Sequence, residues 1–379
     1  AVGQPDPTGT TGGFVDSQSY TAGLSYNQTI FDNFQTEAQI EQARAAAEEA
    51  EHQIRNTEQN VLLSVVQAYM SVLTDRQLVA LQQENLEFFR AQLSSSQDRL
   101  EVGEGTRIDV AQAEARLAQG DAAYRAAQAS LEISEATFYR YVGAQPGSLS
   151  DGHNFSSLIP GSLQSALSEA EVGHPGILLA KASIRAAQAA SDQAQGAFGP
   201  TASVSGRLGT GLSSPGQGLT GQVSVQLSVP LYAGGALGAG VRRANIEQIR
   251  SEVDAMSAYD QIREAVISAW AGIQNADAQI SAANAAVSAG REVVAGVVQE
   301  RDLGTRTTLD VLNSQAELST ARESLINASS NKVVATFSLL ASIGRLTAPD
   351  LSLPVEVKTA VPYNRAVEDV WQELRVVAE

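Results

Sequence analysis

The chain of 379 residues contains no cysteine. This absence excludes disulfide bonds, thiolate metal sites and a catalytic thiol, while the redox compartment stays undecided. Aromatic residues make up only 5% of the chain, and alanine, glutamine and serine are abundant. A wide core filled by large rings is therefore excluded. The composition instead suits long helices that pack closely through small side chains.

Basic residues are also scarce. Lysine and arginine number 25 against 42 aspartate and glutamate residues, which leaves a formal net charge of −17. A nucleic-acid-binding protein needs a basic patch, and since none is visible we set nucleic acid aside as a partner. The acidic balance fits a well-solvated surface, and it also fits an acidic pore that prefers cations.

Long apolar runs are missing as well. No stretch of about 18 apolar residues occurs, so we expect no transmembrane helix. No signal peptide is visible, and the chain opens inside a segment rich in glycine, threonine and proline that is typical of a loop. The three histidines lie far apart without metal-ligand spacing, and no site for a metal is expected.

What the chain does contain is an internal repeat. The segment from Val102 to Val110 returns as the segment from Leu303 to Val311, so that Gly103 matches Gly304 (304 − 103 = 201). Three further pairs share this offset: Ile30-Phe31 with Leu231-Tyr232, Ala68-Tyr69 with Ala269-Trp270, and Val142-Gly143 with Ile343-Gly344. Matches in one order at one offset indicate a duplicated structural unit, which can place equivalent residues at equivalent heights in a ring or pore.

Three stretches alternate between apolar and polar residues, at 19–30, 201–208 and 222–231. This period of two predicts antiparallel strands with one apolar and one polar face, and Ile30 is expected on the apolar face. The glycine- and serine-rich stretch 209–220 is expected to be an exposed hairpin loop. Strands of about ten residues are long enough to cross an outer membrane when tilted. A soluble sandwich shows the same alternation, but this chain has too few strands to bury a sheet face.

A very long helical stretch follows each strand block, at about 33–101 and 237–302, and neither contains a proline. At about 1.5 Å per residue, each helix is on the order of 100 Å long. Each is expected to end at a glycine-containing turn and to be followed by a returning helix that ends near Gly143 or Gly344. Shorter helices are expected at 162–171, at 175–197 and near 364–375.

The segments that leave the strands, Asn27 to Asp32 and Val229 to Gly235, and the two turn segments resemble the TolC-like outer membrane efflux family of channel-tunnel proteins, or outer membrane factors. The resemblance covers essentially the whole chain. It implies a mixed α and β membrane protein, a tandem repeat of β-strands and very long α-helices. It also implies a homotrimer, whose shared outer-membrane β-barrel is continuous with a periplasmic α-helical barrel. The residues themselves also call for partners, because three strands cannot close a barrel and open edges are not tolerated in lipid.

The resemblance divides the chain into seven parts: the first-repeat strand and loop of the β-barrel (1–31), the first-repeat α-barrel helices (32–143), an equatorial linker (144–174), a short α-barrel helix (175–199), the second-repeat β-hairpin (200–232), the second-repeat α-barrel helices (233–344) and a C-terminal equatorial segment (345–379). The second repeat has a helix and a strand before its hairpin loop. We expect the first repeat to have the same pair before Ala1.

The function that the resemblance implies is a passive exit duct in the outer membrane of a Gram-negative bacterium, extending into the periplasm. A periplasmic adaptor (membrane fusion protein) and an inner-membrane RND or ABC transporter would open and feed it, in a tripartite efflux or type I secretion system. Outer-membrane lipid is a further partner, and neither a cofactor nor an enzymatic activity is expected. The cargo stays open between small molecules and secreted protein. A coiled-coil envelope scaffold without a pore is the alternative, against which the alternating strands argue.

The resemblance also assigns a periplasmic gate to the turn ends of the helices. Arg306 and Asp109 match family positions that link neighbouring helices, and an Arg–carboxylate link can act as a latch that a partner breaks. The alternative is that both residues only cap helix ends. Asp98 lies near the same end of its helix, and Arg301 stands where the family usually has an aromatic residue.

Asp310 matches an acidic position that the family turns into the lumen, where three copies would form a ring that attracts cations. The family often has a second acid one turn later, and here that residue is Asn313, so only one full ring of charge is expected. The turns match the family's docking sites for the adaptor, at Gly103, Gly105, Thr106, Gly304 and Thr305. The glycines would let a helical hairpin approach closely, although a tight turn by itself also needs glycine.

Overall fold

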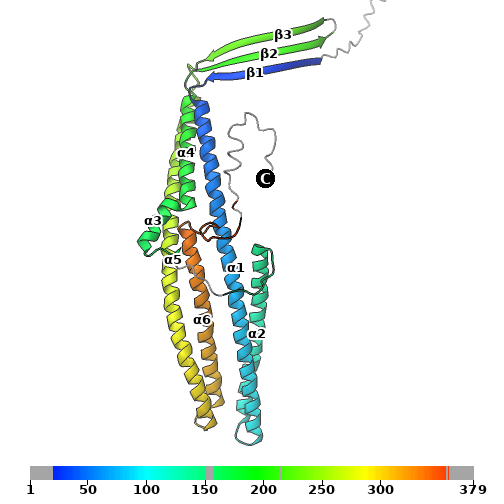
Figure 1. Ribbon diagram of the computed structural model, residues 1–379, viewed down its shortest axis with the longest axis vertical. Helices are drawn as coiled ribbons and strands as arrows, with labels where there is room; N and C mark the ends of the chain where they lie inside the picture. Colours follow the sequence, from blue (N-terminus) through cyan, green and yellow to red (C-terminus); the bar gives the residue numbers. More distant parts are fainter. Residues whose placement is uncertain (1–19, 151–157, 214–215, 356, 358–379) are drawn as a thin grey trace, which may run out of the picture. The chain divides into compact units, whose positions relative to one another are not determined.

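The computed structural model describes residues 20–150, 158–213, 216–355 and 357. Its elements follow the order β1, α1, α2, α3, α4, β2, β3, α5 and α6 (Figure 1). The chain divides into two compact units, Ala1–Ala46 with Ile184–Ser251, and Ala47–Ser183 with Glu252–Glu379. None of the described helices is both long enough and apolar enough to cross a membrane.

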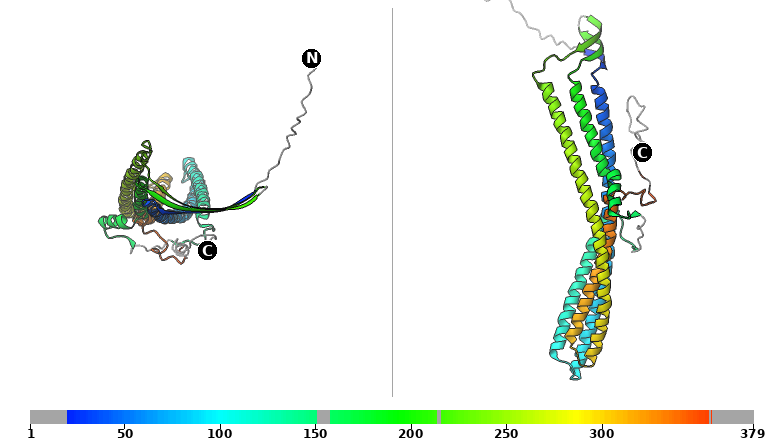
Figure 2. Two further views of the ribbon diagram at one scale, coloured as in Figure 1. Left: turned by 90° about the horizontal axis from the view of Figure 1, so that it is seen from above. Right: turned by 90° about the vertical axis from the view of Figure 1, so that its left-hand side faces the viewer.

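The first unit contains an antiparallel sheet of β1 (Tyr20–Phe31), β2 (Thr201–Ser213) and β3 (Gly216–Ser228), in the order β1-β2-β3. Seen from above, the strands follow one curved course (Figure 2). The predicted loop at 209–220 is wrong, because β2 and β3 continue through it and pair Gly209 with Thr220. A strand ladder is made by the backbone, so glycine and serine join it although they carry no apolar signal.

The two faces of the sheet differ as predicted. Residues that pair directly across strands share a face of the sheet. On the apolar face, Leu24 pairs with Leu208, and Tyr26 pairs with Gly206. Gly206 also pairs with Val223 on the other side. Leu24 is 74% exposed and Val223 is 80% exposed, so nothing in the described chain covers this apolar face.

The ladder between β1 and β2 is irregular at Ile30, so no pairing partner tests the face predicted for this residue. A register shift between Thr29 and Phe31 leaves Ile30 out of the ladder, and Phe31 pairs with Ala202 instead. A β-bulge of this kind adds one residue to a strand and reverses the alternation beyond it.

The long helices confirm the repeat. The helices α1 (Gln35–Glu101) and α5 (Ala236–Asp302) each contain 67 residues, and they begin 201 residues apart (236 − 35 = 201). The returning helices are α2 (Arg107–Val142) and α6 (Thr308–Ser342). Between the repeats lie α3 (Leu163–Gly173) and α4 (Pro175–Gly196). The predicted bounds of the long helices agree to within two residues, while the helix expected near 364–375 lies outside the described residues.

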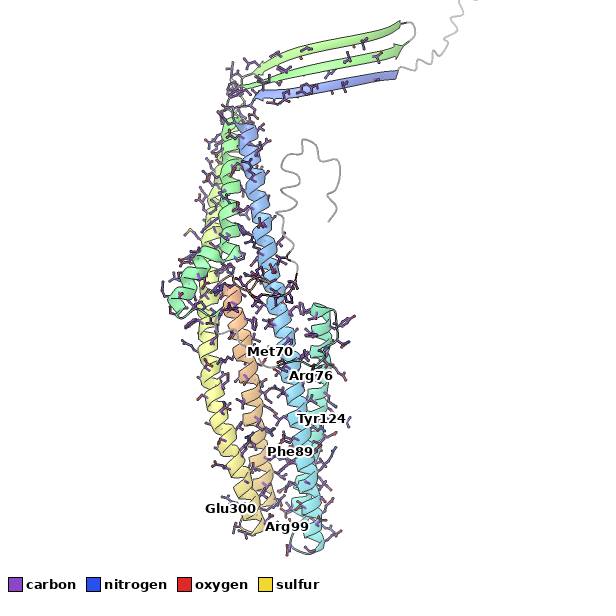
Figure 3. The ribbon with its side chains drawn as sticks, in the orientation of Figure 1. Met70, Arg76, Phe89, Arg99, Tyr124 and Glu300 are labelled. Atoms are coloured by element: carbon purple, nitrogen blue, oxygen red, sulfur yellow. The ribbon has the colours of Figure 1, made fainter. Side chains whose placement is uncertain are left out.

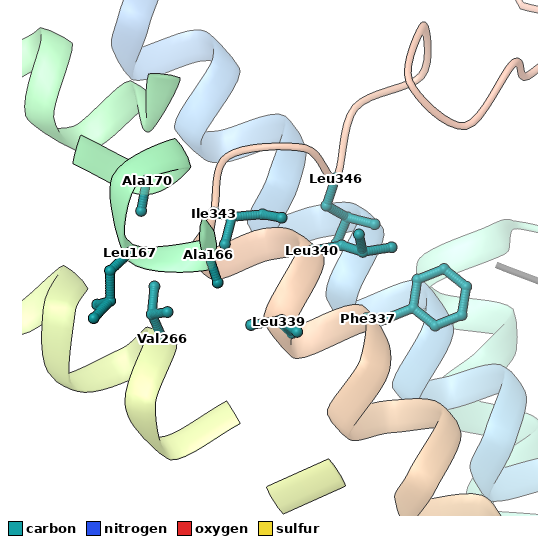
Figure 4. Close-up of a cluster of buried hydrophobic side chains, with 9 residues drawn as sticks. All are labelled: Ala166, Leu167, Ala170, Val266, Phe337, Leu339, Leu340, Ile343 and Leu346. Atoms are coloured by element: carbon teal, nitrogen blue, oxygen red, sulfur yellow. The ribbon is translucent and has the colours of Figure 1, made fainter. Parts of the chain in front are cut away.

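In the second unit, a core cluster joins α3 to α5 and α6 (Figure 4). Three of its leucines, Leu339, Leu340 and Leu346, are fully buried. Burying one such side chain contributes about 1.5–3 kcal/mol relative to leaving it in water. The complete cluster consists of Ala166, Leu167, Ala170, Val266, Phe337, Leu339, Leu340, Ile343 and Leu346.

Candidate functional site

The two turns that end α1 and α5 have the same backbone structure. In the first turn, the N–H of Gly103 donates to the carbonyl of Leu100 at 3.2 Å, and the N–H of Glu104 donates to that of Arg99 at 2.8 Å. In the second turn, Gly304 and Thr305 make the same two bonds, to Arg301 and Glu300, both at 2.9 Å. This is the Schellman motif, which satisfies carbonyls that the end of a helix leaves without partners.

The glycines of these turns have a structural reason of their own. Gly103 and Gly304 have φ angles of 80° and 79°, in the left-handed region that side chains disfavour. A Cβ at Gly105 would lie 3.0 Å from the backbone nitrogen of Leu100. The alternative interpretation, that the turn itself needs glycine, therefore applies at all three positions, and their role in docking stays a prediction.

A capping box begins each returning helix. Thr106 donates to Asp109 Oδ2 through its N–H at 3.0 Å and its hydroxyl at 2.7 Å, and its Oγ1 accepts the N–H of Asp109 at 3.2 Å. Thr307 and Asp310 repeat this arrangement at 2.9, 2.8 and 3.2 Å. Asp109, which was predicted for the latch, and Asp310, which was predicted for the lumen ring, therefore both cap their own helices in the single chain.

The capping bonds also affect the charge of Asp310. Hydrogen bonds from the backbone and the hydroxyl of Thr307, and then the positive charge of Arg306, hold the pKa of this carboxyl below its ordinary value. The group is therefore ionised at every pH above the acidic range. A fixed negative charge of this kind is what a ring that attracts cations requires.

Arg306 makes an ion pair across the second turn. Its Nε lies 2.9 Å from Glu300 Oε2, and about half of each side chain is exposed. The bond to Glu300, followed by the charges of Glu300 and Asp310, raises the pKa of Arg306. Within the described chain, Arg306 and Asp109 do not meet. Figure 3 labels Glu300 at the turn end of α5 and its equivalent Arg99 at the turn end of α1.

Arg301 is the buried member of the predicted gate, with 7% of its surface exposed. Its guanidinium donates to Gln92 Oε1 on α1 and, at 2.7 and 3.1 Å, to Asp302 Oδ1. It thus ties the end of α5 to α1 through a charge-assisted hydrogen bond. Gln92 was not predicted, and no local pattern signals it because the two residues lie 209 positions apart.

The remaining predicted residues have different surroundings. Asn313 Oδ1 accepts a hydrogen bond from Arg116 Nη2 at 2.7 Å, which joins α6 to α2. Thr305 donates its hydroxyl to the carbonyl of Glu300 at 2.9 Å. Asp98 is exposed in the last turn of α1, where its carbonyl accepts the N–H of Val102 at 3.2 Å.

Buried polar contacts also join the two repeats further along their helices. Gln315 Nε2 donates to Asn85 Oδ1 at 2.9 Å, and Asn85 in turn donates to Ser319 Oγ. All three residues are less than a tenth exposed. The contact between α1 and α6 therefore depends on hydrogen bonds as well as apolar packing, which the sequence pattern did not indicate.

Each turn also presents exposed aliphatic side chains that the sequence analysis missed. Val102 and Ile108 flank the first turn with 72% and 69% of their surfaces exposed. Their equivalents at the offset of 201 (303 − 102, 309 − 108), Leu303 and Leu309, are 81% and 38% exposed. The available signal was an apolar residue directly before each turn and a second one at the start of the returning helix. No group of acidic or histidine residues in the described part of the chain is arranged to hold a metal ion.

Comparison with known proteins identifies the family. The model of the outer membrane efflux protein family matches residues 8–144 and 166–345. The outer membrane efflux protein BepC of Brucella suis biovar 1 is 37% identical, over 94% of this chain and 78% of its own length. The alkaline protease secretion protein AprF of Pseudomonas aeruginosa is 27% identical, over 89% and 72%.

Solved structures share the fold. CusC superposes with a TM-score of 0.77 at 18% identity, over 86% of this chain and 78% of its own. The outer membrane protein VceC of Vibrio cholerae gives a TM-score of 0.74 at 16% identity, over 86% and 87%. The sheet, the paired long helices and the match along the chain agree with the prediction from sequence. This chain belongs to the outer membrane efflux protein family, and it is an outer-membrane exit duct.

Proposed function

We propose that three copies of this chain form the duct, and that it carries cargo passively without an enzymatic step or a cofactor. The observation that carries this proposal is the sheet with one polar and one uncovered apolar face. An apolar face such as that of Leu24 and Val223 suits lipid, while the polar face suits a water-filled lumen. Three strands leave open edges, and further copies would pair them. The division into barrel, helical and equatorial parts belongs to this proposal.

The turn ends of the helices form the periplasmic gate in this account. The pairs that Arg306 and Asp109 make in the single chain are exposed and local, so either side chain is free to exchange its partner for one on a neighbouring helix. The hydrogen bonds Arg116–Asn313 and Asn85–Gln315 join the two repeats, and polar contacts can be exchanged when helices slide. Asp310 supplies the ring that attracts cations, and Asp98 and Arg301 belong to the closing network.

The tips of the turns are the docking site for a periplasmic adaptor. Val102 and Leu303 offer exposed apolar surface beside Gly103 and Gly304, where nothing lies within 4 Å of the position a Cβ would take. A helical hairpin of the adaptor can bury these side chains. The inner-membrane partner is an RND or ABC transporter. The names of the relatives include both efflux and protease secretion, so the inner-membrane transporter, and not the duct, determines the cargo.

Single-channel recording in a planar bilayer tests the duct. We expect a small cation-selective conductance from folded trimers of the full chain. Asp310→Asn is expected to lose the cation preference because the ring loses its charge. The matched control is Asp109→Asn, which disturbs the same capping box in the other repeat and is expected to keep the preference. Folded trimers without any conductance would contradict the duct and favour a scaffold without a pore.

A further inference from the structure

The three strands contain a single charged residue, Arg207 in the middle of β2. Its direct partners are Ser25 on β1 and Gln222 on β3. Since paired residues share a face, this row belongs to the polar face, and the neighbouring residue Leu208 belongs to the apolar one. Arg207 is exposed, so its guanidinium is available to whatever medium meets the polar face.

The surroundings of Arg207 on that face are neutral. They consist of hydroxyl and amide side chains and glycine, and Ser205 and Ser224 hydrogen-bond to each other across the strands at 2.8 Å. Asp32 follows the end of β1, seven residues beyond Ser25, which places it roughly 23 Å away along the strand. At physiological salt, charges are screened over about 8 Å. The positive charge of Arg207 is therefore not offset within the sheet.

The direction of the side chain also has an energetic reason. An arginine facing lipid at the middle of a membrane-spanning strand costs about 2–4 kcal/mol, whereas one facing a water-filled lumen does not. A neutral glutamine, as at Gln222, would serve solubility equally well. A guanidinium in this position adds a positive charge, and it offers paired donors to carboxylates and phosphates.

We propose that Arg207 forms a cationic ring in the outer-membrane part of the duct and sets its permeability to anions that carry carboxylate or phosphate groups. The inference rests on the proposed function, because a ring requires three copies with their polar faces around one lumen. The effect of Arg207 then opposes that of the acidic ring of Asp310, so the ion selectivity of the duct is set by two rings of opposite charge.

The absence of cysteine in the chain permits a direct test. Arg207→Cys is reconstituted as the full trimer, and the ratio of chloride to potassium permeability is measured before and after a charged methanethiosulfonate reagent. We expect the substitution to lower this ratio several-fold. A cationic reagent should restore it, an anionic reagent should lower it further, and block by added inorganic phosphate should weaken with the loss of charge.

Leu208→Cys is the matched control, one residue along on the opposite face. We expect neither reagent to change the permeability ratio of this variant. If Arg207→Cys does not assemble, Ser25→Cys places a label in the same row, and an anionic reagent there should also lower the ratio. Equal effects at Leu208 and Arg207 would overturn the assignment of the faces and the ring with it.

The outcomes separate the inference from the proposed function. A conducting wild type that responds to Asp310→Asn but not to any change at Arg207 or Ser25 overturns the cationic ring and leaves the duct in place. Folded trimers that do not conduct overturn both.

Discussion

The two turns that end α1 and α5 have the same backbone structure but different side chains. Both contain a Schellman motif followed by a capping box, with bond lengths that agree within a few tenths of an ångström. The second turn, however, has Arg301 and Arg306 where the first has Leu100 and Gly105. Duplication has therefore kept the hydrogen bonds that end and begin the helices. The first turn in its place has Glu104 and Arg107 where the second has Thr305 and Thr308, so the buried guanidinium of Arg301 and the cross-turn ion pair of Arg306 are what distinguish the second turn.

The contacts inside the two helical hairpins, α1 with α2 and α5 with α6, also differ. In the first, a Cβ at Gly120 of α2 would lie 2.9 Å from the ring of Phe89 on α1. In the second, the residue equivalent to Phe89 is Gly290 (290 − 89 = 201), and the Cδ1 of Leu318 on α6 lies 3.2 Å from the position its Cβ would take. The glycine of the contact thus lies on the returning helix in the first hairpin and on the long helix in the second, and its partner Leu318 is equivalent to Leu117 and not to Gly120 (318 − 117 = 201). Close packing is thus kept by complementary volume and not by identical residues.

The largest effect on stability is expected when Arg301 of the second turn is replaced by leucine, the residue at the equivalent position 100 of the first turn. Arg301→Leu removes the buried guanidinium and leaves Gln92 buried without its partner, which should cost about 2 kcal/mol. Adding Gln92→Val, the residue found at the equivalent position 293, should recover most of this loss because both polar partners are then absent. Thermal unfolding followed by circular dichroism measures both variants. A double variant no more stable than Arg301→Leu would contradict the role of this contact.

A smaller difference in stability is expected from replacing the glycines that lie against Phe89 and Leu318. Gly120→Ala places a methyl group against the rigid ring of Phe89 and should destabilise by about 1 kcal/mol or more. In Gly290→Ala the methyl group meets the flexible end of Leu318, and the better helix propensity of alanine, up to about 1 kcal/mol, should offset the crowding. The melting temperatures of the two variants should therefore move apart. Equal losses in both would show that the hairpins pack alike.

The smallest effect on stability is expected from Asp310, and it depends on pH. The folded-state pKa of Asp310 lies below its ordinary value of 3.8, so its capping contribution is fully present above that value and is lost as the pH falls through the folded pKa. Wild type and Asp310→Asn should therefore differ in unfolding temperature at neutral pH and converge in the acid range. Circular dichroism melts at a series of pH values measure this. A gap that persists at the lowest pH would contradict the assignment to the ionised carboxylate.

The fold was predictable where the sequence carries a long signal. Helices of 67 residues without proline could be bounded to within two residues, and period-two patterns assigned both faces of the sheet. The stretch 209–220 could not be assigned, because a ladder of glycine and serine leaves no trace in hydropathy. The bulge at Ile30 depends on the pairing with β2, which a single strand does not encode.

The candidate site was predictable in position more than in contacts. The repeated glycine and aspartate residues located both turns. The partners of Arg306 and Arg301 were missed for different reasons. Glu300 pairs with Arg306 across a turn, outside the usual helical spacing, while Gln92 reaches Arg301 from a distant helix.

The most direct test of the central claim compares single-channel conductance in Arg306→Gly and Arg99→Ala. Each variant removes one cation beside a turn, and Arg306→Gly copies the residue of the first turn. The account predicts that conductance rises in Arg306→Gly, because the latch of the second turn is lost, and stays at the wild-type level in Arg99→Ala. An equal conductance in wild type and both variants, or an equal rise in both, would contradict a latch formed by Arg306.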